Sequence, residues 1–252
     1  MRGEDEAMKV ILLAGGYATR LWPLTKDTPK ALLDVGESTI LEHMLHIVER
    51  MPSAKIIYLT TNKKFEPNFR KFLAGWKGTK KIELIVEKST SNEQKYGAVG
   101  ALLRMREGGM LDGQTLILAT DNVFDSHFSD MLNAIVAKGE DALVLYDVEK
   151  GERAKLYGVC ELNAEGYVAG FVEKPELPRG TLVSTGSYFL RKETLDTLPE
   201  YEQSGGGMDR LGDFIRWLVQ KGHVHGYVYS GRWFDIGTHE HLERARKAHA
   251  KE

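Results

Sequence analysis

Residues 12–36, LLAGGYATRLWPLTKDTPKALLDVG, decide how the rest of this chain is interpreted. An apolar run at 9–14 leads into this segment and predicts a fully buried strand. Two adjacent glycines, Gly15 and Gly16, follow the run at once, and Arg20 and Lys30 come next. A loop with two glycines and two cations, placed directly after a core strand, indicates a binding loop for an anion.

The loop matches neither standard nucleotide-binding fingerprint, G-x-G-x-x-G or G-x-x-x-x-G-K-[ST]. Gly15 and Gly16 nevertheless let the backbone take positive φ and approach a ligand, so that successive N–H groups can surround phosphate oxygens. Arg20 supplies a planar fork for phosphate, and Lys30 supplies a point charge. The two prolines of the loop should keep the segment between them extended. The alternative is a tight turn that happens to carry two surface cations.

Strands and helices alternate through the first 147 residues. Apolar runs predict buried strands at 9–14, 54–61, 81–87, 114–120 and 141–148. Amphipathic patterns predict helices at 39–51, 65–76, 97–109 and 127–139. This alternation predicts an α/β fold, a Rossmann-like three-layer sandwich with a mixed, mostly parallel central sheet.

The pattern changes from Tyr157 onward. Apolar stretches at 157–162, 167–174 and 182–190 are separated by short turns, which predicts an antiparallel, β-rich lobe. Helices at 209–222 and 239–252 should follow, with a strand at 223–230 between them. Since no linker divides the chain, we expect one domain over 1–252, with a first half at 1–150 and a second at 151–252.

Composition limits the partners and the location that we expect. The net charge of −2 provides no general attraction for nucleic acid or an anionic membrane. No stretch approaches the roughly 18 apolar residues of a spanning helix, and the acidic N-terminus lacks the apolar core of a signal peptide. The single cysteine, Cys160, excludes an intramolecular disulfide and reads as a buried, inert thiol. These features predict a cytoplasmic protein.

Residues 15–33 resemble the signature of the sugar-1-phosphate nucleotidylyltransferases, G-G-x-x-T-R-L-x-P-L-T followed by P-K-x-L. Such enzymes transfer NMP from an NTP to a sugar 1-phosphate and release pyrophosphate. The resemblance implies catalytic roles for Arg20, Lys30 and Lys174. It places the nucleotide against Leu13, Ala14, Gly15, Gly16, Thr19, Glu87, Gly97 and Asp121.

Two aspartates are the Mg²⁺ ligands that the resemblance implies. Asp121 follows a predicted buried strand, at the sheet edge where open α/β folds bind ligands. The family has G-D-N at this position, and here Thr120 replaces the glycine. Asp235 lies in the segment WFDIGT, which resembles the family's W-x-D-x-G-T. Taken alone, each aspartate reads equally well as a turn or helix-start residue, and 114 residues separate them.

The second half carries the segments that resemble the sugar-phosphate site. Glu173 and Lys174 lie in FVEKPE, similar to the family's E-K-P, in which lysine contacts the sugar phosphate and glutamate a sugar hydroxyl. Gly158, Thr185 and Gly186 match segments that surround the sugar. Without the resemblance, the Glu-Lys pair reads as solvated charges on a strand.

The base-side segment leaves the nucleobase open. Gly97 matches a glycine turn that lies against the base in the family. The position that is often glutamine in thymidylyl- and uridylyltransferases is Glu87 here, unless a shifted loop brings Gln94 into its place. Glutamine both donates and accepts, whereas a carboxylate only accepts. A carboxylate suits N1–H and N2–H₂ of guanine, or N4–H₂ of cytosine.

Taken together, the resemblance implies a nucleotidyltransferase that uses Mg²⁺, an NTP and a sugar 1-phosphate, with glucose 1-phosphate and dTTP or UTP favoured. Neither nucleic acid nor a membrane is an expected partner, and a homo-oligomer stays open. Three alternatives remain. They are a mannose-1-phosphate guanylyltransferase, a cytidylyltransferase acting on a non-sugar phosphate, and a non-catalytic sensor of nucleotides or sugar phosphates.

Overall fold

A nine-stranded sheet forms the centre of the molecule in the computed structural model, which describes residues 8–222 and 224–250. The expected absence of a signal peptide concerns residues that lie partly outside this range. The strands follow the order β10 (Val168–Glu173), β9 (Gly158–Leu162), β11 (Leu182–Leu190), β6 (Thr115–Ala119), β1 (Met8–Leu13), β4 (Ala54–Asn62) and β5 (Lys81–Glu87). From β11 the sheet also continues through β8 (Ala142–Asp147) to β12 (His225–Tyr229).

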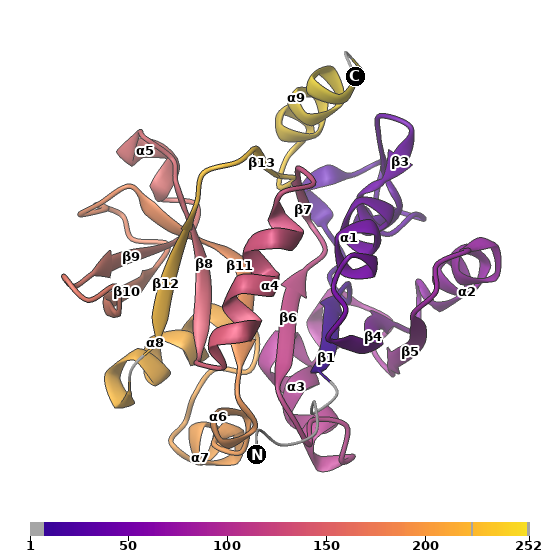
Figure 1. The fold of residues 1–252 in the computed structure, drawn as a ribbon. Helices are drawn as coiled ribbons and strands as arrows, with labels where there is room; N and C mark the ends of the chain where they lie inside the picture. Colours follow the sequence, from indigo (N-terminus) through magenta and orange to yellow (C-terminus); the bar gives the residue numbers. More distant parts are fainter. Residues whose placement is uncertain (1–7, 223, 251–252) are drawn as a thin grey trace.

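The sheet is mixed and mostly parallel, as the sequence predicts. Parallel pairing joins β6, β1, β4 and β5, and also β8 and β12. The exception in the centre is β11, which is antiparallel to both β6 and β8. The β-rich second half therefore contributes a central strand as well as a peripheral lobe (Figure 1).

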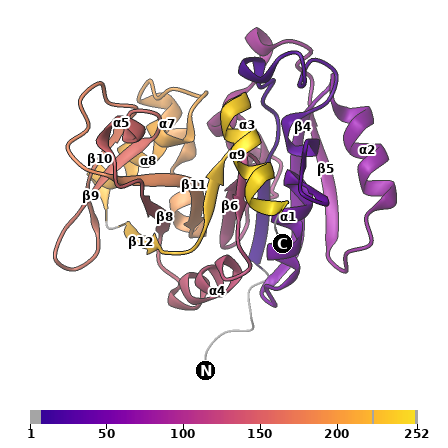
Figure 2. The ribbon, with the colours of Figure 1, turned by 90° about the horizontal axis from the view of Figure 1, so that it is seen from above.

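Helices cover both faces of the sheet and make three layers (Figure 2). One core contains residues of α1 (Ile40–Glu49), α2 (Glu66–Gly75) and α4 (Phe128–Lys138), and the other residues of α3 (Gly97–Glu107), α7 (Leu198–Gln203) and α8 (Leu211–Lys221). The central strand β1 serves both cores because side chains alternate along a strand. Val10 and Leu12 enter the first core, and Ile11 enters the second.

Shorter elements link the two ends of the chain. The strand β7 (Asn122–Phe124) pairs with β13 (Trp233–Asp235), and β2 (Asp34–Val35) pairs with β3 (Ser38–Thr39). The C-terminal helix α9 (His239–His249) packs over β2 and β13. A third core joins Leu21 and Leu33 of the glycine loop region to Leu242 of α9. The remaining helices, α5 (Gly151–Ala154) and α6 (Lys192–Leu195), are single turns.

Two expectations drawn from composition, on membrane-spanning helices and on the cysteine, can be compared with the structure. Among the described helices, none has the length and apolar character needed to cross a bilayer. Cys160 lies buried on β9, and burial raises the pKa of its thiol, as expected for an inert cysteine.

Candidate active site

The glycine loop is held at the carboxyl end of the central strands. The backbone N–H of Ala14 donates to the carbonyl of Thr60 at 3.2 Å, and the Asn62 amide donates to the carbonyl of Gly15 at 3.0 Å. Gly15 and Gly16 do not use the positive φ that glycine permits, and between residues 12 and 35 a positive φ occurs at Ala18, at 47°. A Cβ at Gly16 would meet nothing within 4 Å, so this part of the loop borders open space.

The two cations of the loop have different surroundings. Arg20 lies in a short 3₁₀ turn, Thr19–Leu21, and its side chain is exposed. It forms no hydrogen bond or ion pair with any described residue. Lys30 is half-buried, and its Nζ lies 2.8 Å from Oδ2 of Asp121. Between the two prolines the chain forms turns, so the expected extended segment is wrong. The buried Thr25 hydroxyl stabilises them by donating to the carbonyl of Ala18 at 2.8 Å.

The structure brings Asp121 and Asp235 together through the pairing of β7 with β13. Asp235 lies opposite Asn122, and the backbone N–H of Ile236 donates to the carbonyl of Asp121 at 2.7 Å. The Asn122 amide group also donates to Oδ1 of Asp121 at 3.1 Å. Two carboxylates that are far apart in the sequence therefore occupy neighbouring backbone positions.

The Asp235 carboxylate is held from the second half of the chain. The hydroxyl of Tyr157 donates to Oδ2 of Asp235 at 3.2 Å, and Nδ1 of His241 lies 3.5 Å from the same oxygen. Burial and the nearby carboxylate raise the pKa of Tyr157, so its hydroxyl remains a donor. The Tyr157 ring packs against Trp233 with a centroid distance of 5.3 Å, and the Trp233 indole donates to the Asn122 side chain at 2.7 Å.

These two carboxylates fit a divalent cation that completes its coordination with substrate oxygens. The described residues contain no group of three or more His, Cys, Asp or Glu side chains placed to hold a metal. Mg²⁺ commonly takes only one or two protein carboxylates together with water and substrate phosphates. The donor set of Asp121 and Asp235 matches that pattern.

Lys174 is connected to the same network by its backbone. Its N–H donates to the carbonyl of Tyr157 at 2.9 Å, and its φ of 48° is unusual for a residue with a side chain. The exposed Lys174 ammonium lies 3.8 Å from Oε1 of Glu173, whose side chain is only 13% exposed. Burial raises the pKa of Glu173, and the Lys174 charge opposes this shift.

Three further residues expected around the sugar have roles in packing. A Cβ at Gly158 would lie 2.3 Å from the Phe171 ring, so glycine is needed there for the core. The buried Thr185 hydroxyl donates to the carbonyl of Val144 at 3.0 Å. Gly186 has a φ of 77°, and a Cβ there would lie 3.0 Å from that of Ala119, close to the strand end that precedes Asp121.

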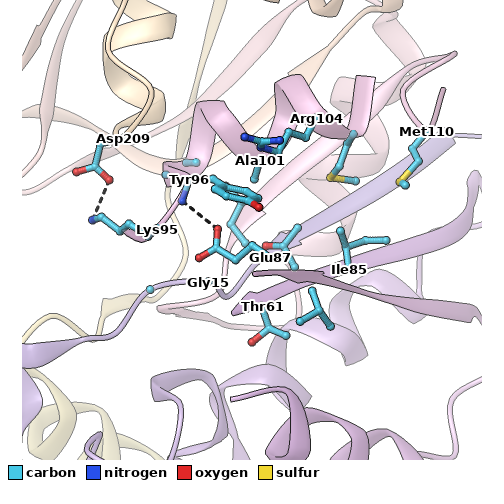
Figure 3. A pocket seen from close by; sticks show the side chains of 17 residues that line it. Gly15, Thr61, Ile85, Glu87, Lys95, Tyr96, Ala101, Arg104, Met110 and Asp209 are labelled. Carbon is cyan, nitrogen blue, oxygen red and sulfur yellow. Dashed lines mark hydrogen bonds and ion pairs between the residues drawn. The ribbon is translucent and has the colours of Figure 1, made fainter. Parts of the chain in front are cut away.

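A cavity of about 330 Å³ opens beside the glycine loop (Figure 3). Leu13, Gly15, Gly16, Glu87 and Gly97 line it, whereas Ala14, Thr19 and Asp121, the other residues that the resemblance places against the nucleotide, do not. Gln94, the alternative to Glu87, is not a lining residue, and its amide oxygen accepts from the Thr90 hydroxyl at 3.0 Å.

The cavity also has lining residues that the sequence patterns did not identify. The Arg104 guanidinium lies over the Tyr96 ring at 4.0 Å, and Lys95 forms an ion pair with Asp209 at 2.8 Å. Gly97 has a φ of 77°, and a Cβ there would lie 2.4 Å from the backbone of Asp209. The helical spacing from Gly97 to Arg104 was a signal that this side chain shares a face with the helix start. The contact with Asp209 had no local signal.

Comparison with known proteins places this arrangement in a family. The family model described as nucleotidyl transferase matches residues 9–252. The chain belongs to the nucleotidyl transferase family. A solved UDP-glucose pyrophosphorylase in complex with UDP-glucose shares the fold, with a TM-score of 0.78 and 19% identity over 97% of this chain and 98% of that one.

Several curated proteins are similar in sequence to this nucleotidyl transferase. It is 29% identical to the bifunctional protein GlmU of Methanococcus maripaludis, over 91% of this chain and 51% of that protein. It is 27% identical to the UTP–glucose-1-phosphate uridylyltransferase AglF of Haloferax volcanii, over 95% of this chain and 96% of that protein. It is 30% identical to a glucose-1-phosphate thymidylyltransferase of Xanthomonas campestris, over 94% of this chain and 79% of that protein. The chain thus spans about half the length of the GlmU relatives.

Proposed function

We propose that this nucleotidyl transferase moves a nucleotidyl group from an NTP to a sugar 1-phosphate, giving an NDP-sugar and pyrophosphate. The observation that carries the proposal is one connected network. It runs from Lys30 and Asp121 through Asn122 and Trp233, and it continues through Tyr157 to Asp235 and the backbone of Lys174. Glucose 1-phosphate is the proposed acceptor because two of the relatives are named for it.

Because the attacking group is already an anion, the main tasks of the protein are to stabilise negative charge and to position the two substrates. An oxygen of the sugar 1-phosphate attacks the α-phosphorus in line, a P–O bond forms, and pyrophosphate leaves with the electrons of the broken bond. Arg20 would stabilise the negative charge that develops on the transferred and leaving phosphates. Lys30 and Lys174 would offset the repulsion between the two polyanions and hold them in line.

Asp121 and Asp235 would hold the Mg²⁺ ion of the reaction. When bound, the ion supplies positive charge that offsets the charge of the NTP phosphates. The side chains around the two carboxylates are suited to orienting them, since Asn122 donates to Asp121 and Tyr157 donates to Asp235. Partners of this kind commonly fix the direction of carboxylate ligands.

Pyrophosphate release is the test that separates this function from its rivals. The assay would combine each of five NTPs with a panel of sugar 1-phosphates and with non-sugar phosphates, in the presence and absence of Mg²⁺. Release that needs both a sugar 1-phosphate and Mg²⁺ is the expected result. Nucleotide binding without release under any condition would support a sensor instead, and release only with CTP and a non-sugar phosphate would support a cytidylyltransferase.

A further inference from the structure

Two carboxylates line the cavity beside the glycine loop, Glu87 and Asp209, and Asp209 is already paired with Lys95. Glu87 ends β5, and Figure 3 shows its side chain beside the backbone N–H of Tyr96 and near Gly15. That N–H donates to Oε2 of Glu87 at 3.2 Å, and the Ser89 hydroxyl donates to Oε1. Because both contacts come from fixed groups at the start and end of one loop, they hold the carboxylate in place at the pocket wall.

Glu87 has no cationic partner within the described part of the chain. The two cations of the pocket are engaged elsewhere: Lys95 pairs with Asp209 at 2.8 Å, and Arg104 lies over the Tyr96 ring. A carboxylate has about four acceptor sites, and the two hydrogen bonds on Glu87 use one on each oxygen. One further acceptor site therefore remains on each oxygen.

A ligand that complements these two adjacent acceptor oxygens would present two adjacent N–H donors. Guanine offers this pair on one edge, N1–H beside N2–H₂. Uracil and thymine offer one N–H between two carbonyl oxygens, and these oxygens would repel a carboxylate. Cytosine and adenine each offer one amino group beside a ring nitrogen that accepts. Guanine is the base whose edge complements the site.

The rest of the cavity is suited to the ring of a base. Much of the remaining wall is apolar and includes Ile85, Met105 and Met110, which suits the faces of an aromatic ring.

We propose that this pocket selects the guanine nucleotide, GTP, and that Glu87 is the residue that determines the choice. The inference rests on the proposed function, since it concerns the donor nucleotide of that reaction. It departs from dTTP or UTP, which the resemblance favours.

The alternative role for Glu87 is to fasten the loop and nothing more. In that case, a change at Glu87 would weaken the binding of all nucleotides to a similar extent. A change in the order of preference among bases, in contrast, follows only if the carboxylate contacts the base. The ratio of affinities between bases is thus the measurement that separates the two roles.

Equilibrium binding by calorimetry tests the proposal without any choice of sugar. ATP, CTP, GTP, UTP and dTTP would be titrated into the full chain with Mg²⁺, followed by inosine triphosphate, which lacks the 2-amino group. We expect GTP to bind at least about tenfold more tightly than UTP or dTTP, and inosine triphosphate to lose a large part of that advantage. Glu87→Gln should reduce the ratio of GTP to UTP affinity by about tenfold or more.

The control is Glu83→Gln, the same substitution on the same strand at a position outside the pocket, which should leave the ratio unchanged. Binding of UTP or dTTP at least as tight as that of GTP would overturn the inference and leave the proposed function standing. Binding of none of the nucleotides would overturn both. Should Glu87→Gln fail to fold, the comparison of GTP with inosine triphosphate in the unaltered protein decides, because equal affinities contradict a contact with the 2-amino group.

Discussion

Arg20 is the residue whose position leaves it free for a ligand. It is exposed, and the described part of the chain gives it no hydrogen bond or ion pair. Arg20→Ala should therefore leave the melting temperature unchanged and lower the rate of pyrophosphate release by about 10²–10³-fold, as the loss of one charge-stabilising group does. Steady-state kinetics and thermal unfolding measure the two effects. Lys26→Ala, an exposed cation of the same loop, is the control, and a near-normal rate in Arg20→Ala would contradict the assigned role.

Glu173 should make stability depend on pH. Burial raises the pKa of its carboxyl in the folded protein, so the stability associated with its protonated form is fully present below the ordinary glutamate pKa. This stability is lost as the pH rises through the folded-state pKa. Glu173→Gln should accordingly melt at a higher temperature than the unaltered protein at pH 7, and the difference should shrink toward pH 4.

Thermal unfolding between pH 4 and pH 8 measures this difference. Glu161→Gln, at an exposed position on the neighbouring strand β9, is the control and should show no comparable gain. A Glu173→Gln melting temperature that follows the unaltered protein at every pH would show that burial of this carboxylate costs the fold nothing.

At the scale of elements, the candidate site depends on the pairing of β7 with β13 and on Tyr157, which connect site residues of the first and second halves of the chain. Tyr157→Phe keeps the ring against Trp233 and removes the hydrogen bond to Asp235. We expect several-fold more Mg²⁺ to be required for half-maximal activity, with a loss of about 1 kcal/mol in unfolding free energy. The measurements are a Mg²⁺ titration of the rate and a direct titration of Mn²⁺ binding.

Tyr146→Phe is the matched control for this prediction. The Tyr146 ring also packs against Trp233, with a centroid distance of 5.1 Å, but its hydroxyl forms no hydrogen bond to Asp235. The Mg²⁺ requirement of Tyr146→Phe should match that of the unaltered protein. An equal shift in both variants would contradict a specific role for the hydrogen bond from Tyr157 to Asp235.

The elements that could be predicted from the sequence are those with a clear hydrophobic period. The strands β1, β4, β5, β6 and β8 and the helices between them lie where their apolar patterns indicate. The short strand β7 and its partner β13 were not expected, because three residues are too few to show a period. The proximity of Asp121 to Asp235 depends on that pairing, so only the resemblance to the family anticipated it.

At the scale of the whole molecule, the pairing of β11 could not be predicted. Its apolar residues indicate a strand, but nothing in them indicates that it lies between β6 and β8, because the partners of a strand are set by the whole sheet. The cavity beside the glycine loop shows the same limit. Its wall includes Glu87 from β5 and Asp209 from a segment just before α8, and the approach of Asp209 to Gly97 is long-range.

This arrangement predicts that the two halves unfold together. The second core contains Val99 from the first half and Phe214 from the second, and β11 pairs with strands of the first half. We expect one calorimetric transition whose measured enthalpy equals its van't Hoff enthalpy. Phe69→Ala in the first half and Phe214→Ala in the second should each reduce the free energy of unfolding by about 3–5 kcal/mol. Each should also lower the midpoint temperature of that single transition. A separate, earlier transition in Phe214→Ala alone would show that residues 151–252 unfold as an independent unit, despite the central position of β11.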